Sequence, residues 1–150
     1  MKIAFFELEQ WEKAYLQQNL ARHDLLLFHH ALSMRDVKTI KDIDCLCTHV
    51  YSDCSAKILS QLLKLKYVAT LSTGYDHIDI SYCKKKRIRV MNVPTYGENT
   101  VAEHTFALIL NLTRMIHKAY DRTVRGDFSL EGLRGTDLQG KTIGVIGVGS

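Results

Sequence analysis

The stretch YVATLSTGYDHIDISYCKKKRIRVMNV, residues 67–93, contains the pattern that decides the fold. It begins with the apolar run YVATLS and ends with the apolar run RVMNV, and the two runs start 22 residues apart. The polar segment between them, 79–86, suits a short surface helix, and Asp79 or Ser81 can cap its first turn. A strand, a helix and a second strand in this order predict one crossover unit of a parallel β-sheet.

The same spacing extends toward the N-terminus. Apolar runs begin every 21 or 22 residues, at Lys2, Asp24, Cys45, Tyr67 and Arg89. The runs are continuous rather than alternating, which is typical of strands buried on both faces of a parallel sheet. Helical periodicity over 12–20 and 55–63 fills two of the gaps, whereas 33–42 shows no clear pattern. Leucine-rich repeats have a similar period, but no L-x-x-L-x-L signature recurs here.

The pattern changes after the fifth run. Pro94 ends that strand, because proline cannot continue a central strand. Thr100 and Glu103 then fit a capping box at the start of a long helix. We expect this helix to run from 100 to 119, to be largely buried by its broad apolar face, and to bridge two bodies.

The final residues combine a new apolar strand, predicted over 142–146, with a Gly-x-Gly turn. A polar, glycine-containing loop over 121–140 precedes that strand. In dinucleotide-binding folds, the glycine matching Gly147 permits a tight turn, and the one matching Gly149 lets the backbone approach the pyrophosphate. The third glycine of the fingerprint would follow Ser150. A plain turn is the alternative interpretation of this half motif.

Two further loops follow predicted strands. LSTGYDHID (71–79) follows the fourth strand, and NVPTYGENT (92–100) follows the fifth. Ligands of open α/β sheets bind at the carboxyl ends of the strands. The Thr73-Gly74 turn can therefore offer consecutive N–H donors to a carboxylate, and Tyr96 can reach the same cleft. The alternatives are a strand-to-helix turn capped by an aspartate and a tyrosine that only packs its ring.

The composition is that of an ordinary globular protein. The chain has 150 residues, of which 46% are hydrophobic and 24% charged, and its formal net charge is +4. These values exclude a disordered, collagen-like or disulfide-scaffold protein, and the length alone suggests one domain. The basic run KKKRIR (84–89) lacks interleaved aromatic residues, so we interpret it as the solvated end of a helix and expect no nucleic-acid partner.

Neither the N-terminus nor the hydropathy indicates export. The first apolar run is too short for a signal peptide, and no apolar stretch reaches the roughly 18 residues that span a membrane. We therefore expect a cytoplasmic protein with free thiols and no membrane partner. Cys45-x-Cys47 would lie on one face of a strand, but zinc usually needs a second pair of ligands. We interpret both as buried structural cysteines and expect no metal.

Three motifs together resemble the D-isomer-specific 2-hydroxyacid dehydrogenase family: LSTGYDHID (71–79), NVPTYGENTVAEH (92–104) and LQGKTIGVIGVGS (138–150). They occur in that family's order and spacing. The resemblance implies an α/β protein with a flavodoxin-like parallel-sheet substrate domain over 1–98. It implies that 99–150 contain a bridging helix, a loop and the first strand of an incomplete, NAD-binding Rossmann domain. It also implies a homodimer in the full-length form.

The resemblance also assigns residues to the site. It implies that backbone N–H groups of Thr73 and Gly74 hold the substrate carboxylate and that Tyr96 lies near the substrate. The cofactor is NAD, with NADP as an open alternative, and the residues implied beside it are Val101, Gly147, Gly149 and Ser150. The family's catalytic His, its partner Glu and its substrate-binding Arg follow the fingerprint, so none is expected within this chain. His77 is expected to face solvent.

Two functions are compatible with these observations. The first is the N-terminal part of an NAD-dependent oxidoreductase that interconverts a 2-keto acid and a D-2-hydroxy acid by hydride transfer. By itself this chain is expected to be inactive, because the acid/base and the Arg are missing. The alternative is a non-catalytic flavodoxin-like module that binds a small carboxylate or dimerises. The sequence leaves open which acid is used and whether Ser150 is a biological C-terminus or a truncation.

Overall fold

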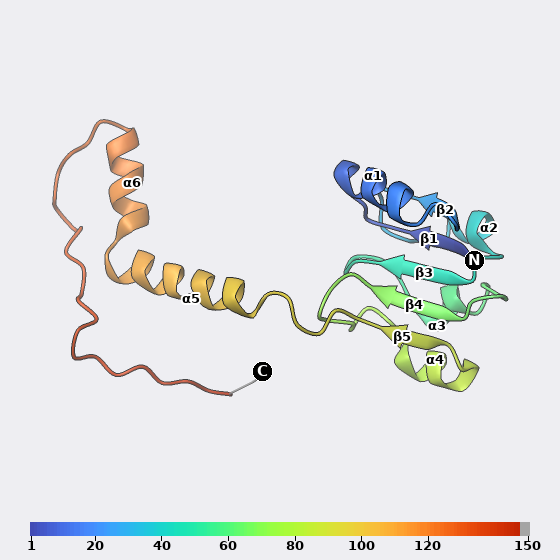
Figure 1. Ribbon diagram of the computed structural model, residues 1–150. Coiled ribbons are helices and arrows are strands. Elements are labelled where there is room, and N and C mark those ends of the chain that lie inside the picture. Colours follow the sequence, from blue (N-terminus) through green and yellow to red (C-terminus); the bar gives the residue numbers. More distant parts are fainter. Residues whose placement is uncertain (148–150) are drawn as a thin grey trace. The chain divides into compact units, whose positions relative to one another are not determined.

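The computed structural model describes residues 1–147 and divides into two compact units (Figure 1). The first unit runs from Met1 to Tyr96, and the second begins at Gly97. That these units correspond to a substrate domain over 1–98 and the start of a cofactor domain over 99–150 stays a prediction.

The first unit is built on a parallel sheet with the strand order β2-β1-β3-β4-β5. Its strands are β1 (Lys2–Phe5), β2 (Asp24–Leu27), β3 (Cys45–Thr48), β4 (Tyr67–Thr70) and β5 (Arg89–Met91). Each strand coincides with one predicted apolar run, and each neighbouring pair is parallel. This order is that of flavodoxin-like sheets, which confirms the predicted α/β fold class for this unit.

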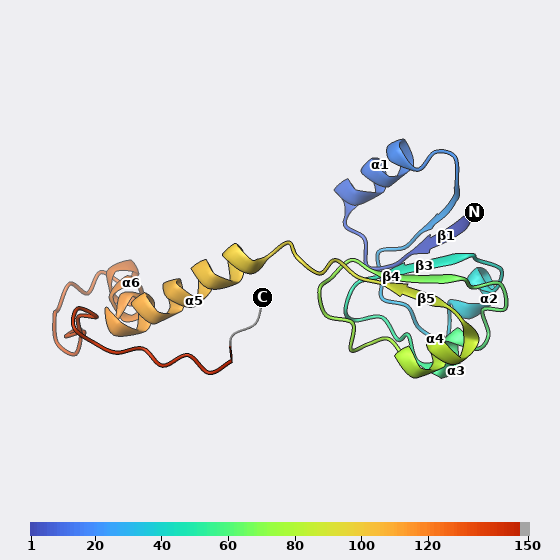
Figure 2. The same cartoon turned by 60° about the horizontal axis from the view of Figure 1, so that its bottom comes forward.

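Helices described by the structure cover the two faces of this sheet: α1 (Gln10–Asn19), α2 (Val37–Ile40), α3 (Ala56–Leu59) and α4 (Ile80–Lys86). Figure 2 shows α1 on one side of the strands and α2, α3 and α4 on the other. Only one turn of the helix predicted over 55–63 forms. That turn buries Ile58 and Leu59, and the chain after it buries Leu62 without continuing the helix, whereas Leu63 faces solvent.

Local capping explains where α1 and α4 begin. Asp79 is the N-cap of α4, and its carboxylate accepts a hydrogen bond from the Tyr82 N–H at 2.8 Å, as one of the two sequence alternatives proposed. At the start of α1, the N–H of Glu9 donates to the Glu12 carboxylate at 2.7 Å, which completes a capping box. Each cap satisfies N–H groups that a helix leaves unpaired at its first turn.

Two apolar clusters hold the sheet between its helices. Alternate residues of a strand point to opposite faces, so Ile3 and Phe5 lie on the side of α1, whereas Ala4 lies on the other side. The larger cluster packs under α2, α3 and α4. The smaller one, called the α1-side cluster below, has five buried members: Ile3, Phe5, Leu8, Cys45 and Cys47.

The second unit contains two helices in place of the single helix predicted over 100–119. These are α5 (Glu98–Thr113) and α6 (Ile116–Val124). Met115 between them has a left-handed φ of 55°, a conformation that interrupts a right-handed helix. Helix α5 begins two residues before Thr100 and has no side-chain cap, so the predicted capping box is wrong.

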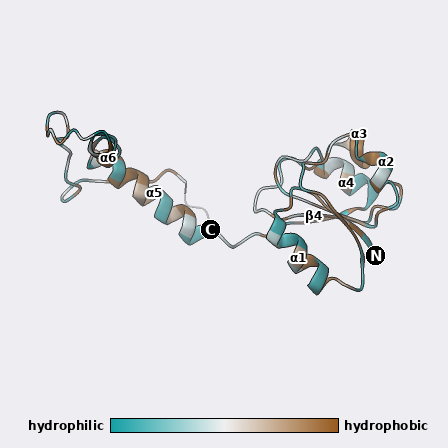
Figure 3. Ribbon diagram, turned by 90° about the horizontal axis from the view of Figure 1, so that it is seen from above, coloured by the Kyte–Doolittle hydropathy of each residue, from teal (hydrophilic) through white to brown (hydrophobic). Residues whose placement is uncertain are grey.

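Figure 3 shows hydrophobic residues along α5. None of the residues of this helix is buried, contrary to the prediction. Val101 and Phe106 are both more than half exposed, because within the described part of this unit no layer packs on that face. Residues 142–146 form no strand either. A strand needs a hydrogen-bonded neighbour, and none lies beside this segment in residues 97–147.

No helix within the described residues is long and apolar enough to cross a membrane.

The loop after α6 is attached to the end of α5. The Thr136 N–H donates to the Thr113 carbonyl at 2.8 Å, and Arg114 forms an ion pair with Asp137. Gly135 lies directly against the Thr113 backbone, where a Cβ atom would overlap with the carbonyl oxygen. This attachment depends on the absence of a side chain at Gly135.

Candidate functional site

The loop that follows β4 is held against the segment that follows β5. The Thr73 hydroxyl donates to the Val93 carbonyl at 3.0 Å, and the Asn92 amide donates to the Thr73 carbonyl at 2.9 Å. Beneath them, the hydroxyl of buried Ser72 donates to the Gly74 carbonyl at 2.7 Å. These bonds leave the backbone of the turn little freedom, so its N–H groups have a set direction.

Thr73 and Gly74 present unpaired N–H groups. Among the hydrogen bonds of the described residues, neither backbone N–H finds an acceptor, and both residues are exposed. Consecutive N–H groups of this kind can bind an anion between them. A Cβ atom at Gly74 would meet only the Asp76 carboxylate, at 3.9 Å. The fold therefore tolerates a larger residue here, and any demand for glycine would come from a ligand.

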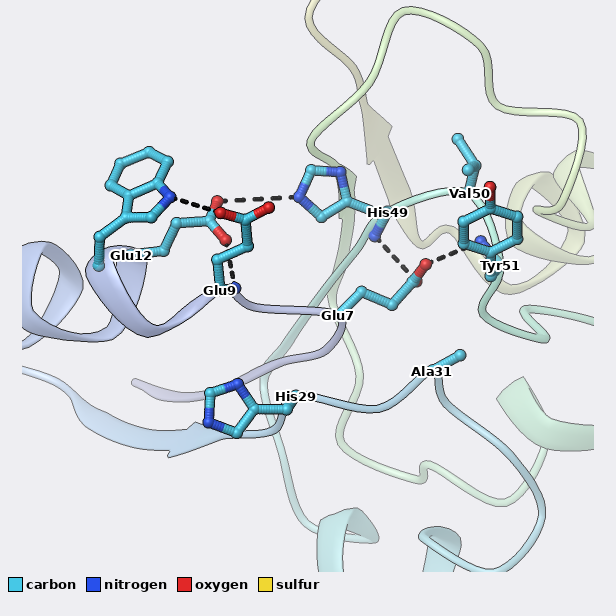
Figure 4. A pocket seen from close by; sticks show the side chains of 9 residues that line it. Glu7, Glu9, Glu12, His29, Ala31, His49, Val50 and Tyr51 are labelled. Atoms are coloured by element: carbon cyan, nitrogen blue, oxygen red, sulfur yellow. Dashed lines mark hydrogen bonds and ion pairs between the residues drawn. The ribbon is translucent and has the colours of Figure 1, made fainter. Parts of the chain in front are cut away.

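A cavity of about 520 Å³ lies at the carboxyl ends of β1, β2 and β3 (Figure 4). The connection that leaves β1 leads to β2 at one edge of the sheet, whereas the connection that leaves the neighbouring β3 leads to β4 in the opposite direction. Ligands of doubly wound sheets bind outside the carboxyl ends at this point. The residues that line the cavity are Glu7, Glu9, Trp11, Glu12, His29, Ala31, His49, Val50 and Tyr51.

Glu7 ties two loops of this cavity together. Its carboxylate accepts hydrogen bonds from the N–H groups of His49, Tyr51 and Ser52, and from the Ser52 hydroxyl at 2.5 Å. Glu7 comes two residues after the end of β1 and has a left-handed φ of 64°, which is unfavourable for a residue with a side chain. The charge-assisted bonds offset that strain, so they fix the loop after β3.

Two imidazoles supply further polar groups to the same cavity. His49 Nε2 lies 3.8 Å from Glu12 Oε1, as the dashed line in Figure 4 shows. His29 Nδ1 lies 2.6 Å from the Leu8 carbonyl oxygen. The cavity therefore contains both hydrogen-bond donors and acceptors and suits a small polar ligand.

His77 is partly buried, and the expectation that it faces solvent is wrong. Its Nε2 lies 3.2 Å from the Thr48 hydroxyl at the end of β3. Because β3 and β4 are neighbours, the loop after β4 brings the His77 ring against the end of β3. Burial lowers the pKa of His77 below its ordinary value, so the ring is uncharged at neutral pH.

The remaining predicted site residues lie in different parts of the chain. Tyr96 is exposed at the end of the first unit, and Val101 is exposed on α5 of the second. Gly147 has a φ of 83°, a left-handed conformation typical of glycine at a tight turn. Gly149 and Ser150 lie outside the described residues. Within 1–147, no three His, Cys, Asp or Glu side chains are grouped to hold a metal ion.

The comparison with protein families decides the family. The model for the catalytic domain of D-isomer specific 2-hydroxyacid dehydrogenases matches residues 3–129. This chain belongs to that family.

Curated relatives and solved structures agree with this assignment. The chain is 38% identical to D-lactate dehydrogenase of Escherichia coli and 37% identical to a 2-hydroxyacid dehydrogenase homolog of Haemophilus influenzae, in each case over 99% of this chain and 46% of the relative. A solved D-lactate dehydrogenase of Aquifex aeolicus, in complex with NAD and lactic acid, has a TM-score of 0.85 at 32% identity over 91% of this chain and 41% of that one. The chain spans about half the length of the relatives it matches.

The structure of this chain also shows two candidate site residues, Glu7 and His49, that were not predicted from the sequence. His49 directly follows β3 and Glu7 comes two residues after the end of β1, just as Thr73 and Gly74 come shortly after β4. The signal was therefore present: polar residues after the first and third apolar runs, at the sheet edge where parallel strands end.

Proposed function

We propose that this chain is the N-terminal part of an NAD-dependent oxidoreductase that interconverts a 2-keto acid and a D-2-hydroxy acid by hydride transfer. The observation that carries the proposal is the pair of unpaired N–H groups of Thr73 and Gly74 at the carboxyl end of β4. Every 2-keto acid and 2-hydroxy acid has a carboxylate, and two N–H donors suit its two oxygens. The Aquifex aeolicus relative in complex with lactic acid supports this substrate class.

Within this proposal, Thr73 and Gly74 hold the carboxylate and Tyr96 lies near the rest of the substrate. Gly147 fits a turn beside a pyrophosphate, because its φ is left-handed and nothing lies within 4 Å of a Cβ atom there. Val101, Gly149 and Ser150 complete the proposed cofactor residues. Bound NAD would supply the hydride acceptor or donor.

The proposal extends to organisation and location. Residues 1–98 would form the substrate domain, and 99–150 the beginning of the cofactor domain. The exposed apolar residues of α5 support a homodimer in the full-length form. All four cysteines are free, which supports the reducing cytoplasm as the compartment. The proposed cofactor is NAD, and the residue that selects between NAD and NADP follows the fingerprint.

The carboxylate site can be tested on this chain by NMR. Titration with pyruvate should shift the backbone amide signals of Thr73 and Gly74, whereas pyruvamide, which lacks the carboxylate, should not. Gly74→Val should weaken pyruvate binding about tenfold or more, because its branched side chain covers the donor pair. The fold should not change, since the position has room for a Cβ atom. Unshifted Thr73 and Gly74 signals would exclude the proposed site.

The activity needs a longer protein that contains this chain. Such a protein should oxidise NADH with a 2-keto acid such as pyruvate, hydroxypyruvate or glyoxylate, whereas residues 1–150 alone should not. Inactivity toward a broad panel of keto acids would exclude the dehydrogenase.

A non-catalytic carboxylate-binding module is the second candidate. It is favoured by the position of the donor pair, which lies entirely within the first unit. Pyruvate binding at Thr73 and Gly74 together with an inactive longer protein would support this candidate over the enzyme.

A further inference from the structure

Cys45 and Cys47 form a close pair of thiols on β3. They are two residues apart on a strand, so both side chains point to the same face, and their sulfur atoms lie 3.8 Å apart. Both thiols are free. The pair belongs to the α1-side cluster and has no part in the carboxylate site at the end of β4.

The surroundings of the pair are apolar. In the sheet register, Phe5 of β1 and Ala69 of β4 lie on either side of Cys47, and both pack in the same cluster. No third side chain of a kind that binds metals joins the pair, since the described residues contain no group of three such side chains. The site therefore offers two sulfur ligands and an apolar lining.

The cover over this pair is thin. Helix α1 is the helix on this side of the sheet in Figure 2, and none of its residues is fully buried. An apolar cavity of about 350 Å³ lies between α1 and the sheet, and Leu8, Leu16 and Leu71 of the cluster line it. An element with few buried contacts opens locally at low free energy. Neither cysteine lines this cavity, so a small apolar reagent would reach the buried thiols when α1 opens locally.

The distance between the sulfur atoms determines which chemistry they suit. Two bonds of about 2.3 Å, the length of a zinc–thiolate bond, can span up to about 4.6 Å between their sulfur atoms, so sulfur atoms 3.8 Å apart are within reach of one bridging atom. Three-coordinate arsenic is pyramidal, so binding draws the two sulfur atoms closer together. Zinc itself needs four ligands in a structural site. A disulfide would require much closer sulfur atoms, and Cα atoms two residues apart on a strand lie about 6.6 Å from each other, near the upper limit for disulfides.

We propose that Cys45 and Cys47 are a dithiol site that binds one thiophilic atom between both sulfur atoms, with trivalent arsenic in an aryl arsenoxide as the ligand class. Two S–H groups react with one As=O group. Two As–S bonds form, the bonds between arsenic and oxygen break, and the oxygen leaves as water with both thiol protons. Arsenic keeps its oxidation state, so the reaction needs no oxidant or reductant.

The ionisation of the pair favours this reaction. The hydrogen bond between the two sulfur atoms stabilises the Cys45 thiolate and lowers the pKa of Cys45. The same bond, together with burial, raises the pKa of Cys47. Because the thiolate is the nucleophile, Cys45 attacks arsenic first and Cys47 closes the second bond.

Phenylarsine oxide is the probe. The folded, reduced chain is incubated with one equivalent, unfolded, alkylated with iodoacetamide and analysed by mass spectrometry. We expect one arsenical per chain and protection of Cys45 and Cys47, with Cys54 and Cys83 alkylated. A dithiol reductant should remove the arsenical, whereas a monothiol at the same thiol concentration should not. This result is read on the unmodified chain and does not depend on a variant that folds.

Matched variants complete the experiment. Cys45→Ala and Cys47→Ala should each weaken arsenical binding about 100-fold or more, because one of the two linked contacts is lost. The double variant Cys54→Ala/Cys83→Ala removes the other two buried thiols and should bind as the unmodified chain does. Protection of Cys54 or Cys83, binding of two arsenicals, or four alkylated thiols would each overturn the proposal.

Discussion

The two units of this molecule contain similar apolar patterns but bury them very differently. In the first unit, Phe6, Leu46 and Val68 are completely buried between the sheet and its helices. In the second unit, α5 is rich in apolar residues, yet none of them is buried. A periodic apolar pattern predicts which face a helix or strand can bury, but burial also needs a second surface. The first unit supplies that surface from its own residues.

The largest difference in stability should come from replacing one phenylalanine in each unit by alanine. Phe6 is fully buried and stacks on Phe28 with ring centroids 4.5 Å apart. Phe6→Ala should lower the free energy of unfolding by about 3–5 kcal/mol. Phe106→Ala on α5, where the ring is exposed, should change it by less than about 0.5 kcal/mol. Urea unfolding followed by circular dichroism measures both, and equal effects would remove the contrast between the units.

Glu7→Gln should give the next largest effect. An amide lacks the charge and one of the two acceptor oxygens. Its remaining oxygen can still accept from His49 and Ser52, which donate to the same carboxylate oxygen, but the Tyr51 N–H, which donates to the other one, loses its acceptor. We expect a loss of about 2 kcal/mol in the free energy of unfolding and faster hydrogen exchange at the Tyr51 amide. The matched Glu131→Gln, at an exposed position of the second unit, should leave both quantities unchanged.

A smaller, local effect is expected in the second unit from Gly135→Ala. The added methyl group overlaps with the Thr113 carbonyl and should break the bond from the Thr136 N–H. Loss of one hydrogen bond corresponds to about 1 kcal/mol, seen as faster hydrogen exchange at Thr136. Gly144→Ala, where a Cβ atom meets nothing within 4 Å, is the control. Unchanged exchange in Gly135→Ala would show that the loop is not attached to α5 there.

The smallest effect is a pH dependence in the first unit through His77. Burial holds its pKa below the ordinary value of 6.5, so below that pH the unfolded chain binds the proton more readily. The stability contribution is therefore complete above pH 6.5 and is lost as the pH falls toward the lowered pKa. His77→Asn should flatten this part of the stability profile. An NMR titration in which the His77 ring titrates above pH 6.5 would contradict the prediction.

Much of the first unit could be predicted from the sequence. The five strands and the Asp79 cap are local properties, because continuous apolar runs and capping side chains act within a few residues. The Thr73-Gly74 turn could be located for the same reason, although its role as a carboxylate site stays a prediction. Glu7 and His49 could be located after two of the apolar runs, but the cavity that they line could not be predicted, because it combines the ends of three strands that are distant in the sequence.

The second unit shows where local reasoning stops. The residues from Thr100 to Glu103 have the sequence of a capping box, but α5 begins two residues earlier. The apolar segment 142–146 has the composition of a strand, but without a neighbouring strand in the described residues its backbone has no ladder to join. The prediction that this helix is buried was wrong for the same reason. Strand formation and helix burial both depend on contacts with other segments of the chain.

The sequence by itself determined the parallel α/β order of residues 1–96, the resemblance to the family and the location of the Thr73-Gly74 turn, because the apolar period, the turn residues and the motifs are local features of the chain. Only the tertiary structure decided which polar groups meet. It brought Glu7 to the loop after β3, covered His77 with the end of that strand, placed the sulfur atoms of Cys45 and Cys47 3.8 Å apart, and left α5 exposed. These properties depend on distances between segments that are far apart in the sequence, and those distances exist only in the folded chain.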